Sequence, residues 1–220
     1  MIKFLLKVDV VEYIEMEFPV PPEEMFYMDK IFQKFYVNKT WYNLSHLDAL
    51  GILRDRWIDI LKAILANQRP LKIGTRGLGY EWNQITAQEI RYCDRGNYWW
   101  GISYIVGGGF NGEKYTSGWL YNDEQGQIIF EVTENYFWHF EDESEGEHYI
   151  TYQEFMKNYK PLITRIIPHE VARRWLAQCE HLLEQICENE KKWDEHITLN
   201  EQLHKEGKCE ECNAKGITYG

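Results

Sequence analysis

Two cysteines near the end of the chain form the most specific chemical pattern in the sequence. Cys209 and Cys212 are separated by two residues, the spacing at which two thiolates bind one tetrahedral zinc ion. His204, five residues before the first cysteine, is a candidate third ligand. Candidates for the fourth ligand are His196, Cys179, Cys187 and a residue of a second chain. No second Cys/His pair stands at a fixed spacing, so we expect no cofactor, with zinc at these residues as the alternative.

A histidine and two carboxylates could carry acid–base chemistry. Alternation along residues 127–140 places Glu131, His139 and Glu141 on one face of a predicted strand. A histidine beside a carboxylate can act as a general acid or base, so a hydrolase using His139 with Glu131 or Glu141 is the enzymatic alternative. The sequence has no Ser or Cys nucleophile in an elbow and no H-E-x-x-H motif. We therefore interpret this face as the solvated outer side of a sheet and expect no enzyme.

Two glycine-rich segments could bind phosphate or another anion. Residues 107–112 match G-x-G-x-x-G, but the residues that follow are typical of a strand and not of the helix that a dinucleotide site requires. We expect a hairpin loop there. Residues 74–79 carry Arg76 among three glycines and could hold an anion through backbone N–H groups. Such a segment is more often a simple connection, which is what we expect here.

Aromatic and acidic residues suggest a binding surface. Residues 80–140 hold 16 aromatic side chains but only three basic ones, a composition unlike that of proteins that stack on single-stranded nucleic acid. Tyrosine and tryptophan are common anchors of protein interfaces. The net charge of −11 would attract a basic protein. The predicted partner-binding residues are Trp99, Trp100, Trp119, Glu141, Asp142 and Glu143.

Composition limits the class of protein. A chain of 220 residues with 44% hydrophobic residues can bury a substantial core and is not a disordered chain. The apolar start of the chain is broken at Lys7, so we expect no secretion signal, and no stretch is long enough to span a membrane. Five cysteines, an odd number, fit reduced thiols and a cytoplasmic location. The acidity disfavours binding to nucleic acid.

The first third of the chain predicts one strand and two helices. Residues 2–18 alternate like a strand and are stopped by prolines. A short helix is expected from Pro22, with Phe26, Ile31, Phe32 and Phe35 as its apolar residues. A stronger helix is predicted over residues 45–66, with Ser45 as its N-cap and Asp48 in its first turn.

The rest of the chain predicts a sheet followed by helices. Successive strands are expected at residues 98–106, 114–121 and 127–140, with a hairpin turn at residues 122–126. Thr151 is the expected cap of a short helix, followed by a brief strand or linker at residues 162–167. Pro168 then opens a long helix whose stripe is Ala172, Trp175, Leu176, Cys179, Leu182, Leu183 and Ile186.

These elements predict an α+β fold. We expect an antiparallel meander packed with helices on one face, a long C-terminal helix and a polar tail. The predicted organisation is one α+β domain over residues 1–187 and a helical or polar appendage over residues 188–220, which holds the cysteine pair. The predicted function is cytoplasmic, non-catalytic protein binding. One form of it is an inhibitor or immunity-type partner of a basic protein, and in overall character the chain is similar to small acidic immunity proteins.

Overall fold

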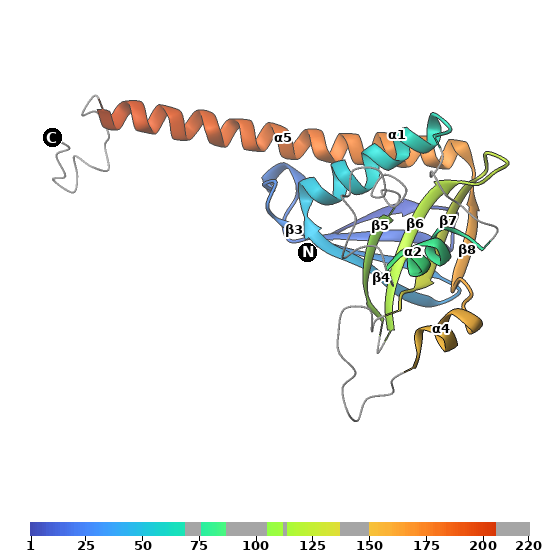
Figure 1. Ribbon diagram of the computed structural model, residues 1–220. Helices are drawn as coiled ribbons and strands as arrows, with labels where there is room; N and C mark the ends of the chain where they lie inside the picture. Colours follow the sequence, from blue (N-terminus) through green and yellow to red (C-terminus); the bar gives the residue numbers. More distant parts are fainter. Residues whose placement is uncertain (69–75, 87–104, 112–113, 137–149, 206–220) are drawn as a thin grey trace.

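The fold consists of two antiparallel four-stranded sheets and a long C-terminal helix (Figure 1). The computed structural model describes residues 1–68, 76–86, 105–111, 114–136 and 150–205. The first sheet has the order β1-β2-β3-β4 and the second the order β5-β6-β7-β8, each strand pairing with its neighbour in sequence. The predicted α+β class is confirmed.

The first sheet departs from the sequence prediction in two places. Residues 2–18 form a hairpin of β1 (Ile2–Lys7) and β2 (Tyr13–Phe18) instead of one strand. Asp9 causes the turn, because its carboxylate accepts hydrogen bonds from the backbone N–H groups of Val11 (2.7 Å) and Glu12 (2.9 Å).

The helix expected after Pro22 is also shorter than predicted. Only the 3₁₀ turn η1 (Pro22–Glu24) is helical, and Ile31 and Phe35 lie on β3 (Lys30–Val37). The sheet is completed by β4 (Thr40–Asp48). Ile31 and Phe35 are buried on one face of β3, as alternate positions of a strand require.

The helix predicted over residues 45–66 begins later than expected. Ser45 lies within β4, so the prediction of an N-cap at Ser45 is wrong. A π-helical segment, η2 (Gly51–Ile58), leads directly into α1 (Asp59–Leu65). Asp48 provides the cap, since its carboxylate accepts a hydrogen bond from Gly51 N–H at 2.8 Å. Leu53 and Trp57 of this segment are fully buried, so one face of it packs into the core.

The second sheet contains β5 (Ile105–Asn111), β6 (Lys114–Asn122), β7 (Ile128–Glu134) and β8 (Ile163–Ile167). The hairpin turn predicted between β6 and β7 is confirmed, with the Asp123 carboxylate accepting from Gln125 N–H and Gln127 N–H. The glycines at 107–109 lie inside β5 and pair with residues 116–118 of β6. The loop predicted there is therefore a strand.

Two short helices flank the second sheet, α2 (Leu78–Thr86) and α4 (Tyr152–Asn158). The predicted cap of α4 is confirmed, because the Thr151 hydroxyl accepts a hydrogen bond from Glu154 N–H at 3.2 Å. Helix α2 contacts β6 and β7, and Trp82 of α2 stacks against Trp119 of β6 with ring centroids 5.6 Å apart.

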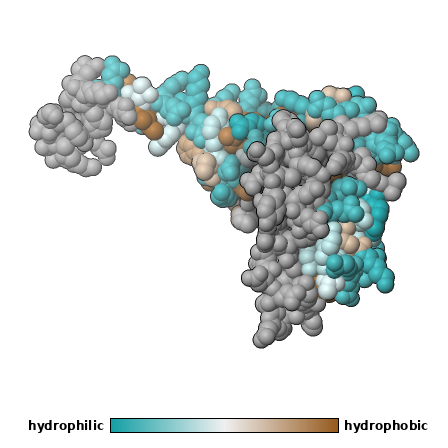
Figure 2. Space-filling model, viewed as in Figure 1, coloured by the Kyte–Doolittle hydropathy of each residue, from teal (hydrophilic) through white to brown (hydrophobic). Residues whose placement is uncertain are grey.

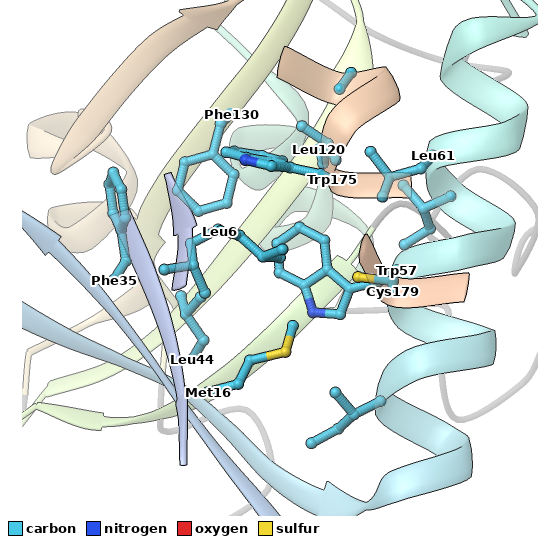
Figure 3. Close-up of a cluster of buried hydrophobic side chains, with 14 of the residues drawn as sticks. Leu6, Met16, Phe35, Leu44, Trp57, Leu61, Leu120, Phe130, Trp175 and Cys179 are labelled. Atoms are coloured by element: carbon cyan, nitrogen blue, oxygen red, sulfur yellow. The ribbon is translucent and has the colours of Figure 1, made fainter. Parts of the chain in front are cut away.

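The main core lies between the two sheets and the helices η2, α1 and α5 (Figure 3). Phe35 of the first sheet meets Phe130 of the second edge to face, with ring centroids 4.7 Å apart. Trp57 and Trp175 make a similar contact at 5.9 Å between η2 and α5. Burial of these rings therefore joins the two sheets to the C-terminal helix.

Helix α5 (His169–Lys205) begins directly after Pro168, as predicted. Trp175, Leu182 and Ile186 of its stripe are buried, while Leu176 and Leu183 are only partly buried. The Trp175 indole also donates a hydrogen bond to the backbone carbonyl of Lys7, at 2.9 Å. The domain boundary predicted at residue 187 falls inside this continuous helix.

Candidate functional site

The polar face of β7 is buried and not solvated. We predicted that Glu131, Thr133 and Asn135 face solvent, but each is buried, and Glu131 is only 1% exposed. Helix α2 lies against β6 and β7, with Gly79 N–H donating to the Glu131 carboxylate at 3.2 Å. The expectation was wrong because parity assigns residues to faces but does not reveal which face another element will cover.

Two glycines allow α2 to come this close. A Cβ atom built on Gly77 would lie 2.3 Å from a carboxylate oxygen of Glu131, and one on Gly79 would lie 2.4 Å from the hydroxyl oxygen of Thr133. Gly77 also has φ of +88°, a backbone conformation that disfavours other residues. The two glycines of the segment considered as an anion site, Gly77 and Gly79, therefore face a carboxylate of the chain itself, that of Glu131.

The Glu131 carboxylate is hydrogen-bonded by neutral donors. It accepts from the Tyr121 hydroxyl at 2.5 Å and from Gly79 N–H at 3.2 Å. Burial raises the pKa of Glu131, and the hydrogen bonds from Tyr121 and from N–H groups at the start of α2 only partly offset this effect. Such a carboxylate can hold a proton at higher pH than an exposed one, or pair with a cation.

The amide side chain of Asn83 joins α2 to the end of β7. The Asn83 side chain donates to the carbonyl groups of Gly79 (2.9 Å) and Glu134 (3.1 Å), and it accepts from Tyr136 N–H at 2.7 Å. Because these bonds link helix and strand through buried polar groups, they hold α2 in a defined position above Glu131.

A pocket opens beside Glu131. Its volume is about 500 Å³, and Glu131, Tyr121, Tyr159 and Arg76 are among its lining residues. The Arg76 guanidinium lies 4.0 Å from the centre of the Tyr80 ring and donates to the Tyr159 carbonyl at 3.0 Å. The Tyr159 hydroxyl is buried near Glu131 and Thr133 and makes no hydrogen bond of good geometry within the described ranges.

A second candidate surface is the part of α5 that leaves the body, residues 191–205, which we call the arm (Figure 1). At its base, Tyr27 N–H donates to Glu190 at 2.7 Å, and Asn189 donates to the Met25 carbonyl at 2.8 Å. Trp193 meets Phe26 edge to face at 5.6 Å. The arm is thus anchored to the loop before β3.

Exposed apolar side chains continue along the arm. Trp193, Ile197 and Leu199 are 50%, 40% and 54% exposed. Figure 2 shows hydrophobic side chains gathered on one side of the helix as it leaves the body. Trp193 and Ile197 are four residues apart and therefore share a face. The prediction of a helical or polar appendage over residues 188–220 did not include this face, although the spacing of Ile186, Trp193 and Ile197 extends the buried stripe.

A third surface is the outer face of the first sheet. Tyr13, Tyr36 and Trp41 form a row of rings across β2, β3 and β4, with centroids 4.7 to 5.9 Å apart. Next to this row, Glu17 pairs with Lys3 and Lys34. The lysines neutralise this part of the face, which therefore provides rings but no free acidic patch.

The predicted partner-binding residues are only partly located. Trp119 is fully buried and its indole donates to Thr133 at 2.9 Å. Its ring belongs to the interior because α2 covers this face, so it offers no surface to a partner. Five other residues lie outside the described residues: Trp99, Trp100, Glu141, Asp142 and Glu143. His139, the proposed hydrolase base, lies outside them as well.

The zinc prediction stays open. His204 lies in the last turn of α5, while Cys209 and Cys212 are outside the described residues. Across the described part of the chain, no three His, Cys, Asp or Glu residues are grouped as metal ligands. Cys179 and Cys187, the alternative ligands, lie within α5, and Cys179 is fully buried in the core.

Comparison with known proteins gave no match: no protein-family model, no curated protein and no solved structure is similar to this chain. None of the helices within the described ranges is long and apolar enough to cross a membrane.

Proposed function

We propose that this chain is a non-catalytic protein-binding domain and that its partner docks on the arm. The observation that carries the proposal is the exposed apolar face formed by Trp193 and Ile197 on a helix that extends past the rest of the fold (Figure 1). Amphipathic helices with apolar residues at this spacing commonly bind in an apolar groove of another protein.

The length of the arm supports a bound partner. Fifteen helical residues span roughly 22 Å, and an isolated helix of this length is only marginally stable in water. Most helices in proteins gain their stability by packing an apolar face. A partner groove would cover Ile197 and the open side of Trp193, and so provide packing for the apolar face of the arm.

Charge favours a basic partner. The chain has a net charge of −11, and Asp194 is exposed directly after Trp193, whereas Glu195 is paired with Lys191 at 3.9 Å. Opposite charge accelerates encounter, whereas buried apolar side chains slow dissociation. An inhibitor or immunity-type protein that neutralises a basic partner would combine both effects.

A photo-crosslinking residue in the arm tests the proposal. It is placed at Ile197 in one variant and at Thr198 in a matched control, because both positions are exposed but point to different sides of α5. We expect a single protein adduct from a lysate of the source organism at position 197 and little at position 198.

The captured protein is then purified and its affinity measured. Ile197→Ser should weaken binding by about tenfold or more, Thr198→Ala by less than about twofold, and added salt should slow association. Circular dichroism checks that both variants keep their helix content. Equal affinities of the two variants, or equal crosslinking at both positions, would contradict docking on this face.

A further inference from the structure

We infer that the pocket beside Glu131 binds an organic cation, an ammonium or guanidinium group carried on an alkyl chain. This inference is independent of the proposed role of the arm, since the pocket lies on the second sheet, next to the residues that precede α2, and shares no residue with the arm. The binding group is Glu131, and the walls are tyrosine rings and aliphatic side chains.

The first argument is that the buried Glu131 carboxylate has no ion-pair partner among the described residues. Glu131 is 1% exposed, and its hydrogen bonds come from the neutral donors Tyr121 and Gly79. No ion pair to Glu131 is present among the residues whose placement is described. Buried carboxylates in proteins are usually paired, because removing an unpaired charge from water is costly. A cation in the adjoining pocket would supply the missing partner.

The second argument is the hydroxyl of Tyr159. This side chain is 8% exposed and lines the pocket, and its hydroxyl lies near Glu131 and Thr133 but makes no hydrogen bond of good geometry among the described residues. Buried hydroxyl groups are nearly always paired. Ammonium and guanidinium groups carry several N–H donors, so one of them can bind the Glu131 carboxylate while another binds this oxygen.

The walls suit the rest of such a ligand. Tyr121 and Tyr159 present aromatic surface, on which cations bind favourably, and Ile129 and Pro161 provide apolar contacts for an alkyl chain. The same region already holds one guanidinium group, since Arg76 lies over the Tyr80 ring. The site therefore combines the elements of cation recognition.

The charges at the pocket do not suit an anion. Asp123 and Glu124 line it together with Glu131, which gives three carboxylates against the two cations Arg76 and Lys160. Arg76 is also engaged with the Tyr159 carbonyl and the Tyr80 ring. An anionic ligand would therefore approach a buried negative charge with little free positive charge to compensate it.

The test uses ligand pairs that differ only in charge. Butylguanidinium is compared with the neutral butylurea, and a short peptide with one arginine is compared with the same peptide carrying citrulline. Binding is followed by the NMR shift of Gly79 N–H, which donates to Glu131, and by calorimetry. We expect each cation to bind at least about tenfold more tightly than its neutral counterpart.

Protein variants assign the binding to Glu131. Glu131→Gln should lose about tenfold or more in affinity for the cation, and Tyr159→Phe should lose severalfold because the hydroxyl is absent. Glu170→Gln, an exposed carboxylate at the start of α5, is the matched control and should bind like the wild type. The Tyr159→Phe variant and the ligand pairs keep the test valid if Glu131→Gln does not fold.

The outcomes distinguish the sources of the cation. Binding of butylguanidinium supports a site for a free amine or guanidine, whereas binding of the arginine peptide alone supports a site for a side chain of a partner protein. Equal binding of charged and neutral ligands, no binding of either cation, or unchanged affinity in both pocket variants would overturn the inference. None of these results depends on whether a protein docks on the arm.

Discussion

The close packing of α2 on β7 predicts that Gly79→Ala destabilises the fold. A Cβ atom at residue 79 would lie 2.4 and 2.5 Å from two side-chain atoms of Thr133 and 2.7 Å from the Tyr159 hydroxyl, about 1 Å closer than ordinary contact. Alanine would gain about 1 kcal/mol of helix propensity over glycine. Overpacking of a filled interior costs about 1–3 kcal/mol or more, so we expect a net loss of about 1–3 kcal/mol.

Urea unfolding monitored by circular dichroism measures this loss as a lower midpoint at unchanged slope. Gly51→Ala is the matched control, because its nearest contact would be the Asp48 carboxylate at 3.1 Å, which needs to shift by only a few tenths of an ångström, so its cost should be much smaller than that of Gly79→Ala. The double variant Gly79→Ala with Thr133→Ala should lose less than the sum of the single variants, since the second change removes the two nearest of the three clashing atoms. If Gly79→Ala is as stable as the wild type, α2 does not lie this close to β7.

Three further predictions concern the core, the buried carboxylate and the cysteine pair. Leu182→Ala should cost about 2–5 kcal/mol in urea unfolding, and Leu183→Ala less because Leu183 is only partly buried; equal losses would contradict the orientation of α5. Burial raises the pKa of Glu131, so the folded state binds the carboxyl proton more strongly than the unfolded state does. The stability that this provides is complete below pH 4.5 and is lost as the pH rises through the folded-state pKa. The stability of wild type relative to Glu131→Gln should therefore fall with rising pH above 4.5, and a rise would refute the direction of the shift. If Cys209 and Cys212 bind zinc, protein purified without added metal should contain at least about one zinc atom per two chains, and Cys212→Ser should abolish it.

The sequence predicted those turns and helix ends that are formed by residues close to one another in the chain. The turn at Asp123, the cap at Thr151 and the helix start at Pro168 were all recognisable, because each uses side chains within a few residues of the backbone groups that it satisfies. The buried stripe of α5 was also found, since its 3.6-residue period is visible in sequence.

Predictions failed in two situations: where a segment distant in sequence covers a face, and where one residue spacing fits both a helix and a strand. Ile31 and Phe35 are four residues apart, a spacing that fits one face of a helix and also alternate positions of a strand. Glu131 was placed on the correct face with Thr133, but the burial of that face depends on α2, which lies about 50 residues earlier in the chain. The sequence signal for this contact was the pair Gly77 and Gly79, whose small size permits the close approach.

The contact between Trp175 and the backbone of Lys7 has a consequence for biosynthesis. The residues are 168 positions apart, so the first strand is made early but meets its helical partner only after more than three quarters of the chain has been translated. Until then, the apolar side of the first hairpin has no cover from α5. Chains with such distant contacts fold slowly and expose surfaces that aggregate. A nascent chain truncated before α5 should therefore depend on chaperones, whereas the finished chain closes its core in one late step.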